Sequence, residues 1–207
     1  MTDPWAADRE ALWRVLHARR DHRHFRPDPV ATEALERVLD AFRVAPSVGL
    51  SQPWHVTVVR SAGLRDAAYQ SFAGVRTREQ ERFGGERRAL YDTLKLEGIR
   101  EAPVGLVVSF VPPEAATLGT TSLPAALEYS VVSAITLAWL AATAEGLGMG
   151  WVSLVEPGDL HAALDIPAHL RPLAYLCLGH PALELKEPLL QTVGWASSRP
   201  LSVEWRD

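Results

Sequence analysis

The chain has 207 residues, of which 47% are hydrophobic and 22% are charged, and its formal net charge is −4. This composition is typical of a globular protein and excludes a disordered chain, while the length suits one domain with a sizeable core. The negative balance gives no overall attraction to nucleic acid or to an anionic membrane, so any basic function must be local.

The cysteine content and the N-terminal residues bear on the compartment. Cys177 is the one cysteine, so an internal disulfide is impossible and nothing indicates a secreted disulfide scaffold. The first residues, MTDPWAADREALW, include early acids and lack an apolar stretch of signal-peptide length. The longest apolar stretch, around residues 131–144, is too short and too interrupted to span a bilayer. We therefore expect a soluble cytoplasmic protein.

The first half of the chain predicts helices with one clear strand. Residues 8–18 place apolar side chains on one helix face, and a second helix between Pro29 and Pro46 repeats that pattern. Residues 55–60, HVTVVR, alternate as a strand does. Residues 64–98 are polar and predict one or two helices with a break near Gly84 and Gly85.

The second half predicts strands around a long apolar helix. Strands are expected at 104–110, 148–155 and 173–179, a long helix rich in alanine and serine at 125–146, and a short helix near 158–165. The tail after Gly179 contains Trp195 and Trp205, and this much aromatic surface is expected to dock on something, a partner subunit being one candidate. The order of elements indicates an α+β or mixed α/β domain without a linker.

The segment RRDHRHFRPD, residues 19–28, is the first candidate site. Arg19, Arg20 and Arg23 crowd together at a helix end, where planar guanidinium groups can bind phosphate oxygens. The alternative is a solvated basic helix end favoured by the helix dipole. Asp21 lies among these cations and raises the question of what a carboxylate does there.

Three other motifs are less specific. GLGMGWVS is no dinucleotide fingerprint, because a helix precedes its glycines and a strand follows them; its Ser153 faces either a site or the core. In PSVGLSQPWH, residues 46–55, Gln52 suits the edge of a heteroaromatic ring, although a simple turn before the next strand is the alternative. The pair His22 and His24 is rejected as a metal site, since arginines on both sides would repel a cation.

Taken together and in this order, the motifs resemble one family. RRDHR, APSVGLSQPW, LKLEGIREAP (residues 94–103), GLGMGWVSL and LAYLCLG are similar to those of the nitroreductase-like flavoproteins and, within them, of the BluB family of 5,6-dimethylbenzimidazole synthases. The resemblance covers residues 10–200, and LKLEGIREAP is its most specific segment because ordinary nitroreductases lack it.

The resemblance implies an α+β nitroreductase-like fold with a central mixed sheet flanked by helices. It implies a single FMN-binding domain over residues 1–207, with a core at about 10–180 and a C-terminal arm at about 181–207 that reaches the partner subunit. It further implies a homodimer that binds FMN at each subunit interface.

The reaction implied consumes the flavin. Reduced FMN reacts with O2 and is fragmented to 5,6-dimethylbenzimidazole, the lower ligand of vitamin B12, and erythrose 4-phosphate. The first ribityl carbon becomes C2 of the benzimidazole, so a proton must leave it. By resemblance, Asp21 is the base or proton relay, and Ser153 hydrogen-bonds near the ring and steers its reaction with oxygen. The arginines are expected to keep Asp21 ionised.

The resemblance also implies the flavin-binding residues. Phosphate and ribityl contacts are expected from Arg19, Arg20 and Arg23, with Arg199 of the arm as a further phosphate partner. Ser47 and Gln52 would face the flavin, and Gly150 and Trp151 would contribute backbone contacts. Apart from the resemblance, a flavin reductase is a candidate supplier of reduced FMN, and NAD(P)H is a candidate indirect reductant.

Two departures from the family pattern bear on the product. Thr136 and Leu137 replace a polar pair in the long helix, and the loop at 117–130 lacks an arginine often found there. Two other activities therefore stay open: a conventional NAD(P)H-dependent nitroreductase or flavin reductase with bound FMN, and a flavin-binding protein without turnover.

Overall fold

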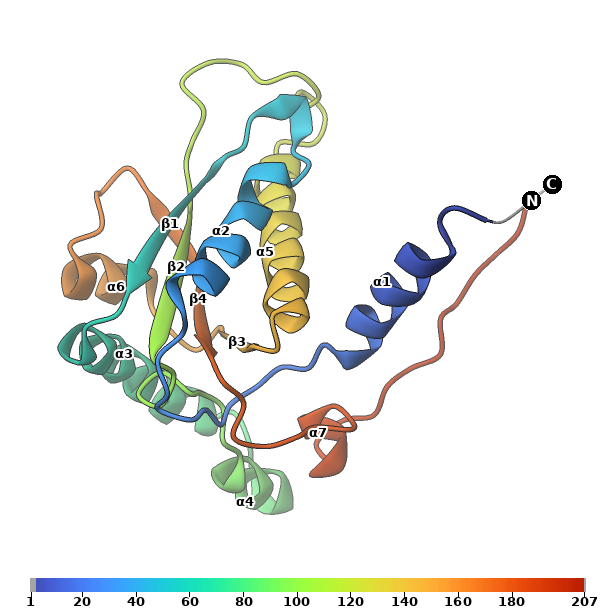
Figure 1. The fold of residues 1–207 in the computed structure, drawn as a ribbon. Coiled ribbons are helices and arrows are strands. Elements are labelled where there is room, and N and C mark those ends of the chain that lie inside the picture. The colour runs from blue at the N-terminus through green and yellow to red at the C-terminus, as the bar shows by residue number, and fades with distance from the viewer. Residues whose placement is uncertain (1–2, 207) are drawn as a thin grey trace.

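The computed structural model describes residues 3–206 and has an α+β architecture with helices on both faces of a central sheet (Figure 1). Within these residues the sheet has four strands, β1 (Trp54–Val59), β2 (Val104–Phe110), β3 (Gly148–Val152) and β4 (Arg171–Gly179), in the order β1-β2-β4-β3. All of their pairings are antiparallel, which corrects the expected mixed sheet. Parallel pairing occurs as an isolated bridge between Asp21 and Met149. Residues 20–24 run beside β3 over too short a distance to form a strand.

The helices agree with the sequence pattern at most of their bounds. They are α1 (Ala6–Ala18), α2 (Thr32–Val44), α3 (Ala62–Gln80), α4 (Gly85–Thr93), α5 (Ala126–Ala144) and α6 (Pro157–Leu164). The expected break falls between α3 and α4, at Gly84 and Gly85. The short helix α7 (Leu189–Thr192) and the 3-10 turn Val48–Leu50 were not predicted, because each is too short to show a hydrophobic period.

The core lies on both faces of the sheet. On one face, α2 and α5 pack against Leu106 and Val108 of β2. On the other face, Val107 of β2 packs with residues of α3 and α6, among them Phe72 and Leu160. Successive side chains of a strand point to opposite faces. Because helices cover both faces, the strand is apolar throughout instead of alternating.

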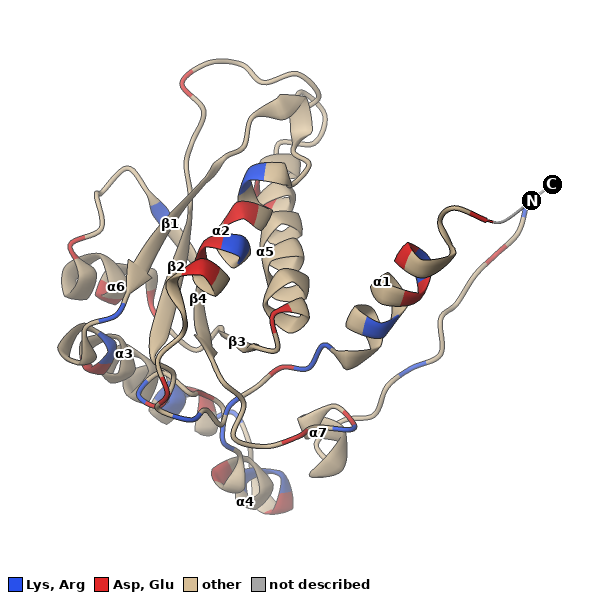
Figure 2. Ribbon diagram, viewed as in Figure 1, with Lys and Arg blue, Asp and Glu red and all other residues tan. Residues whose placement is uncertain are grey.

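Helix α5 is long and apolar enough to cross a membrane by length and composition. It packs against α2 and the sheet, so its apolarity is that of a core helix. One stripe is left uncovered, including Tyr129 and Val132, which are 58% and 42% exposed. In this stripe the hydroxyls of Ser133 and Thr136 donate to carbonyls of the preceding turn, at 2.9 and 3.0 Å. Figure 2 shows almost no charge along α5.

Two segments extend away from the body of the molecule. Helix α1 and the residues after α7 project on the same side of the molecule (Figure 1). The apolar face expected on α1 exists but is uncovered, since its Leu12 and Leu16 are 54% and 37% exposed. In the tail, Trp205 is 86% exposed.

A close backbone approach joins the RRDHR segment to the sheet. The His22 N–H donates to the Met149 carbonyl at 3.0 Å, on the outer edge of β3. A side chain at Gly150 would collide here, because its Cβ would lie 2.0 Å from the His22 oxygen. Glycine at 150 is therefore what allows residues 21–23 to lie against β3.

We predict that Gly150→Ala destabilises the fold by about 1–3 kcal/mol, the usual cost of overpacking, because His22 must move away from β3. The measurement is urea unfolding followed by circular dichroism. Gly158→Ala is the matched control: a Cβ there meets nothing within 4 Å, and alanine in helix α6 should be neutral or slightly stabilising. If both variants are equally stable, the close packing of His22 against β3 does not require glycine at position 150.

Candidate active site

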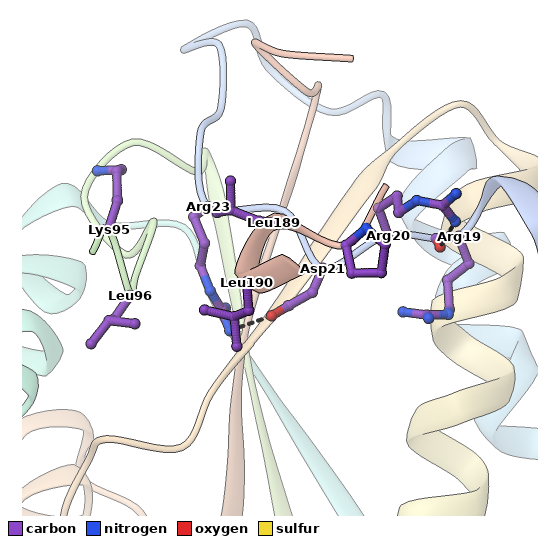
Figure 3. A pocket seen from close by; sticks show the side chains of 9 residues that line it. Arg19, Arg20, Asp21, Arg23, Lys95, Leu96, Leu189 and Leu190 are labelled. Carbon is purple, nitrogen blue, oxygen red and sulfur yellow. Dashed lines mark hydrogen bonds and ion pairs between the residues drawn. The ribbon is translucent and has the colours of Figure 1, made fainter. Parts of the chain in front are cut away.

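A cavity of about 190 Å³ lies where three segments meet (Figure 3). Its walls come from residues 19–23, from residues 95–96 after α4, and from residues 188–190 around the start of α7. We call residues 186–195, which cross this cavity, the strap. Leu189 and Leu190 of the strap lie beside Asp21 and Arg23 in Figure 3. The cavity therefore combines several cations, one carboxylate and an apolar cover.

Asp21 is held on the free edge of β3. Its Oδ1 accepts from the Trp151 N–H at 3.1 Å, and its Oδ2 accepts from Arg23 Nη2 at 2.5 Å. The same Nη2 donates to the Trp151 carbonyl at 2.7 Å. Because β3 is an edge strand, its outward backbone groups need partners from elsewhere. Asp21 and Arg23 supply them, so the edge of the sheet fixes the carboxylate.

Burial raises the pKa of the Asp21 carboxyl above its ordinary value. The attraction of Arg23, the hydrogen bond from Trp151 and the attraction of Arg19 act in the opposite direction but are smaller. The arginines favour the ionised form, as expected, but the loss of water around the carboxylate outweighs their attraction. A carboxylate that holds a proton more tightly than usual is better suited to general-base chemistry.

The cations around Asp21 are engaged in different ways. Arg20 donates to the carbonyls of His17, Arg19 and Lys186 at 2.7, 2.8 and 2.6 Å, so its guanidinium ties the strap to α1. Arg19 lies with its guanidinium carbon 5.2 Å from the centre of the Trp139 ring. Within residues 3–206 this guanidinium makes no hydrogen bond, so Arg19 is the arginine best able to receive an anion.

Lys95 is a cavity residue that sequence reasoning missed. Its Nζ forms ion pairs with Glu101 at 2.6 Å and with Glu97 at 3.6 Å. The signal was present, because all three residues lie in LKLEGIREAP, but the charge pattern alone does not show which of them lines a cavity. Leu189 and Leu190 were also missed, since an apolar pair in a tail shows no period.

Ser153 lies one residue beyond the end of β3 and is exposed. It follows Trp151 along the same edge by two residues, although it is not among the residues that line the cavity. Gly150 and Trp151 are at the site, where Gly150 lies against His22 and the backbone of Trp151 binds Asp21 and Arg23. Arg199 is exposed, after the strap, and lies outside the cavity.

Ser47 and Gln52 lie elsewhere in the chain. The Gln52 N–H donates to Ser47 Oγ at 2.9 Å, and Gln52 Nε2 donates to the Arg43 carbonyl at 3.1 Å. Gly49, Leu50 and Gln52 all have positive φ, at 57, 53 and 42°. Two non-glycine residues in this region indicate a strained turn, which is frequent at binding sites.

A second cavity, of about 260 Å³, is lined by Ser47 and by residues of α5 that include Ser130. The Asp21 cavity meets α5 near Trp139, whose indole N–H donates to the Arg20 carbonyl at 3.2 Å. Ser130 and Trp139 are nine residues apart, which is half a turn around the helix and about 14 Å along it. The two predicted groups of flavin residues therefore lie on opposite sides of α5 in one chain.

The strap is anchored at its far end by Trp195. The Trp195 ring packs edge-on against Phe83 at 5.2 Å and lies 6.0 Å from the ring of Tyr91. Arg87 lies over the same ring at 3.4 Å and donates to the Trp195 carbonyl at 2.8 Å. The aromatic tail thus docks at Trp195 on its own chain, which joins the strap to α4 and to the Lys95 wall.

Comparison with known proteins identifies the family of the chain. The Nitroreductase family model matches residues 16–180. A 5,6-dimethylbenzimidazole synthase of Rhodospirillum rubrum is 42% identical over 194 residues, covering 93% of this chain and 92% of the relative. One of Rhodobacter capsulatus is 40% identical and covers 95% of both. The chain belongs to the BluB family of nitroreductase-like proteins.

Solved structures extend the likeness to the fold. A BluB-like flavoprotein of Clostridium difficile 630 aligns with a TM-score of 0.70 at 19% identity, covering 91% of this chain and 94% of that one. Oxidised iodotyrosine deiodinase bound to FMN and 3-iodo-L-tyrosine aligns with a TM-score of 0.76 at 20% identity, covering 95% and 99%. Because both structures are at most 20% identical to this BluB-family chain, they show a shared fold and nothing further.

We predict that Trp195→Ala releases the strap, because its aromatic and cation–π contacts are lost. Trypsin should then cut after Lys186, within the strap, several times faster than in the parent protein. Intact mass measured over a time course reports the cut. Trp205→Ala serves as the control, since Trp205 is 86% exposed, and cleavage after Lys186 should be unchanged. Equal cleavage of the parent and Trp195→Ala would show that Trp195 does not anchor the strap.

Proposed function

We propose that this protein fragments reduced FMN with O2 to 5,6-dimethylbenzimidazole and erythrose 4-phosphate. The observation that carries the proposal is the carboxylate of Asp21, held on the wall of a basic cavity with a raised pKa. Relatives named 5,6-dimethylbenzimidazole synthase, which align over nearly the whole chain, support it.

The residues present fit a flavin mononucleotide. Arg20 Nε and Arg23 Nη1 are buried nitrogen atoms with no hydrogen-bond partner among residues 3–206. Buried donors without acceptors are costly, so a ligand rich in acceptor oxygens and nitrogens matches this site. Bound reduced FMN would supply the electrons for O2 and the carbon atoms of both named products, while the pyrimidine part of the isoalloxazine ring would leave as a third fragment that takes up the oxygen.

Each residue of the cavity takes one task in this proposal. Arg19 binds the phosphate, and Arg20 holds the strap through Lys186. Asp21 takes the proton that leaves the first ribityl carbon, after which that carbon becomes C2 of the benzimidazole and the four others leave with the phosphate. Leu189 and Leu190 keep water away from the reacting atoms.

The remaining predicted residues are assigned to the ring and the arm. Ser153 at the end of β3 hydrogen-bonds near the ring, next to the backbone of Gly150 and Trp151. Arg199 reaches the phosphate from the arm. Reduced FMN comes from a separate flavin reductase, with NAD(P)H as the reductant of that enzyme.

The site is completed by a second copy of the chain, so the protein is a homodimer. Ser47 and Gln52 lie on the opposite side of α5 from Asp21, and among residues 3–206 the two cavities share no lining residue, which supports a flavin bound between two chains. The uncovered stripe of α5 supports this arrangement. The hydroxyls of Ser133 and Thr136 are already bonded within the helix, so burying this part of the stripe leaves neither of these two donors unpaired.

We predict that chemically reduced FMN mixed with the protein in air yields 5,6-dimethylbenzimidazole, detected by mass spectrometry. Asp21→Asn should lower the yield rate by about 10²–10⁴-fold, the usual contribution of a general base, while FMN still binds. If FMN is reoxidised intact by both proteins and NAD(P)H is consumed rapidly, the protein is a conventional reductase. If neither compound is consumed, it is a flavin-binding protein without turnover.

We predict that Val132→Arg converts the dimer to a monomer, because it places a charge in the apolar stripe of α5. Light scattering after size-exclusion chromatography measures the mass. Leu64→Arg on α3 is the matched control, since Leu64 and Val132 are both 42% exposed, and its dimer should persist. A monomeric parent protein, or a dimer that survives Val132→Arg, would contradict the proposed interface.

A further inference from the structure

Arg23 differs from its neighbours in how deeply it lies. Its side chain is 13% exposed, whereas that of Asp21 is 43% exposed. The sequence grouped Arg23 with the phosphate-binding arginines, yet its Nη2 is committed to two acceptors of the protein, Asp21 and the Trp151 carbonyl. The position of Arg23 therefore points to a task other than holding the phosphate.

The three residues form a closed set of hydrogen bonds. The Trp151 N–H binds one oxygen of Asp21, Arg23 binds the other, and Arg23 returns to the Trp151 carbonyl. Each bond restrains a different rotation, since the first limits how far the carboxylate can move from β3 and the second limits its rotation about the Cβ–Cγ bond. Charge-assisted hydrogen bonds of this kind are short and directional.

We propose that Arg23 is a positioning residue for Asp21, which it holds against the free edge of β3 in the orientation needed for proton transfer. This inference rests on the proposed function, in which Asp21 is the base. Arg23 acts through Asp21, while its buried Nη1 can still donate one hydrogen bond to the ligand.

The other cations that face Asp21 do not replace Arg23. Arg20 is bound to backbone carbonyls and Lys95 to Glu101. Arg19 attracts the carboxylate, but less than Arg23 does. Loss of Arg23 thus removes the strongest cationic influence on Asp21.

The uncharged groups nearby do not compensate either. Cys177 lies next to Gly150 in the sheet, and burial raises the pKa of its thiol to about 12, so it is neutral. Burial lowers the pKa of His22, with Arg20 and Arg19 acting in the same direction, so this imidazole also favours its neutral form.

The test compares Arg23→Gln, Arg23→Lys and the control Arg26→Gln. Arg26 is exposed and its ion pair with Asp28, at 3.6 Å, lies outside the cavity. The proton affinity of Asp21 is measured without turnover, from its carboxylate infrared band, isolated as the difference between each protein and the same protein carrying Asp21→Asn. Formation of 5,6-dimethylbenzimidazole and FMN affinity are measured on the same proteins.

For Arg23→Gln we expect the infrared midpoint to move to higher pH, because the ionised carboxylate loses its nearest cation. The rate should fall by about a hundredfold, within the range of a general base that is poorly aligned. FMN affinity should fall by no more than about tenfold, the value of one hydrogen bond. Arg23→Lys should keep the parent midpoint but regain only part of the rate, because an ammonium lacks the planar fork. Arg26→Gln should match the parent in all three measurements.

An unchanged midpoint in Arg23→Gln would overturn the proposal, whether or not the product forms. Equal losses of FMN affinity and rate would also overturn it, since Arg23 would then act on the flavin directly. If the parent protein forms no 5,6-dimethylbenzimidazole, the proposed function fails, and the infrared midpoint then decides alone whether Arg23 governs Asp21.

Discussion

The hydrogen bonds on the outer edge of β3 are the constraint on which the site depends. An edge strand leaves every second residue with an N–H and a C=O that need partners. Here the main chain of residues 21–22 and the side chains of Asp21 and Arg23 provide them. Two glycines of β3 make this possible, because a side chain at Gly148 or Gly150 would collide with His22. The atoms that satisfy the hydrogen bonds of the sheet edge are thus the same atoms that fix the carboxylate proposed as the base.

The same edge explains why neighbouring arginines have different tasks. Arg23 is turned inward onto β3, Arg20 is turned onto the backbone of α1 and the strap, and Arg19 is left beside Trp139. A cluster that looks uniform in the sequence therefore makes a different set of contacts at each arginine. Fewer of these arginines are free to bind an anion than the charge of the segment suggests, because Arg23 and Arg20 instead bind β3, α1 and the strap.

The fold was largely predictable from the sequence, while the site was predictable only in part. Apolar periodicity located α2 and alternation located β1, while continuous apolar runs located α5 and β2. The direction of strand pairing was not accessible, and the predicted mixed sheet is antiparallel. Asp21 was found because a carboxylate among arginines is unusual. The sign of its pKa shift was missed because charges are visible in a sequence and burial is not. Lys95 and the strap were missed because they are more than 70 residues away from Asp21 in the sequence, and a sequence does not show which distant residues come into contact.

The strap has a consequence for the kinetics of flavin capture. Sites for ligands of this size commonly enclose about 300–1,000 Å³, whereas the cavity under the strap encloses about 190 Å³. Because the proposed site lies between two chains, this cavity is the part of it that one chain supplies. The strap is held by Trp195 at one end and by Arg20 at the other, so under the proposed function its opening would add a first-order step to flavin association. The same contacts would slow the release of bound flavin.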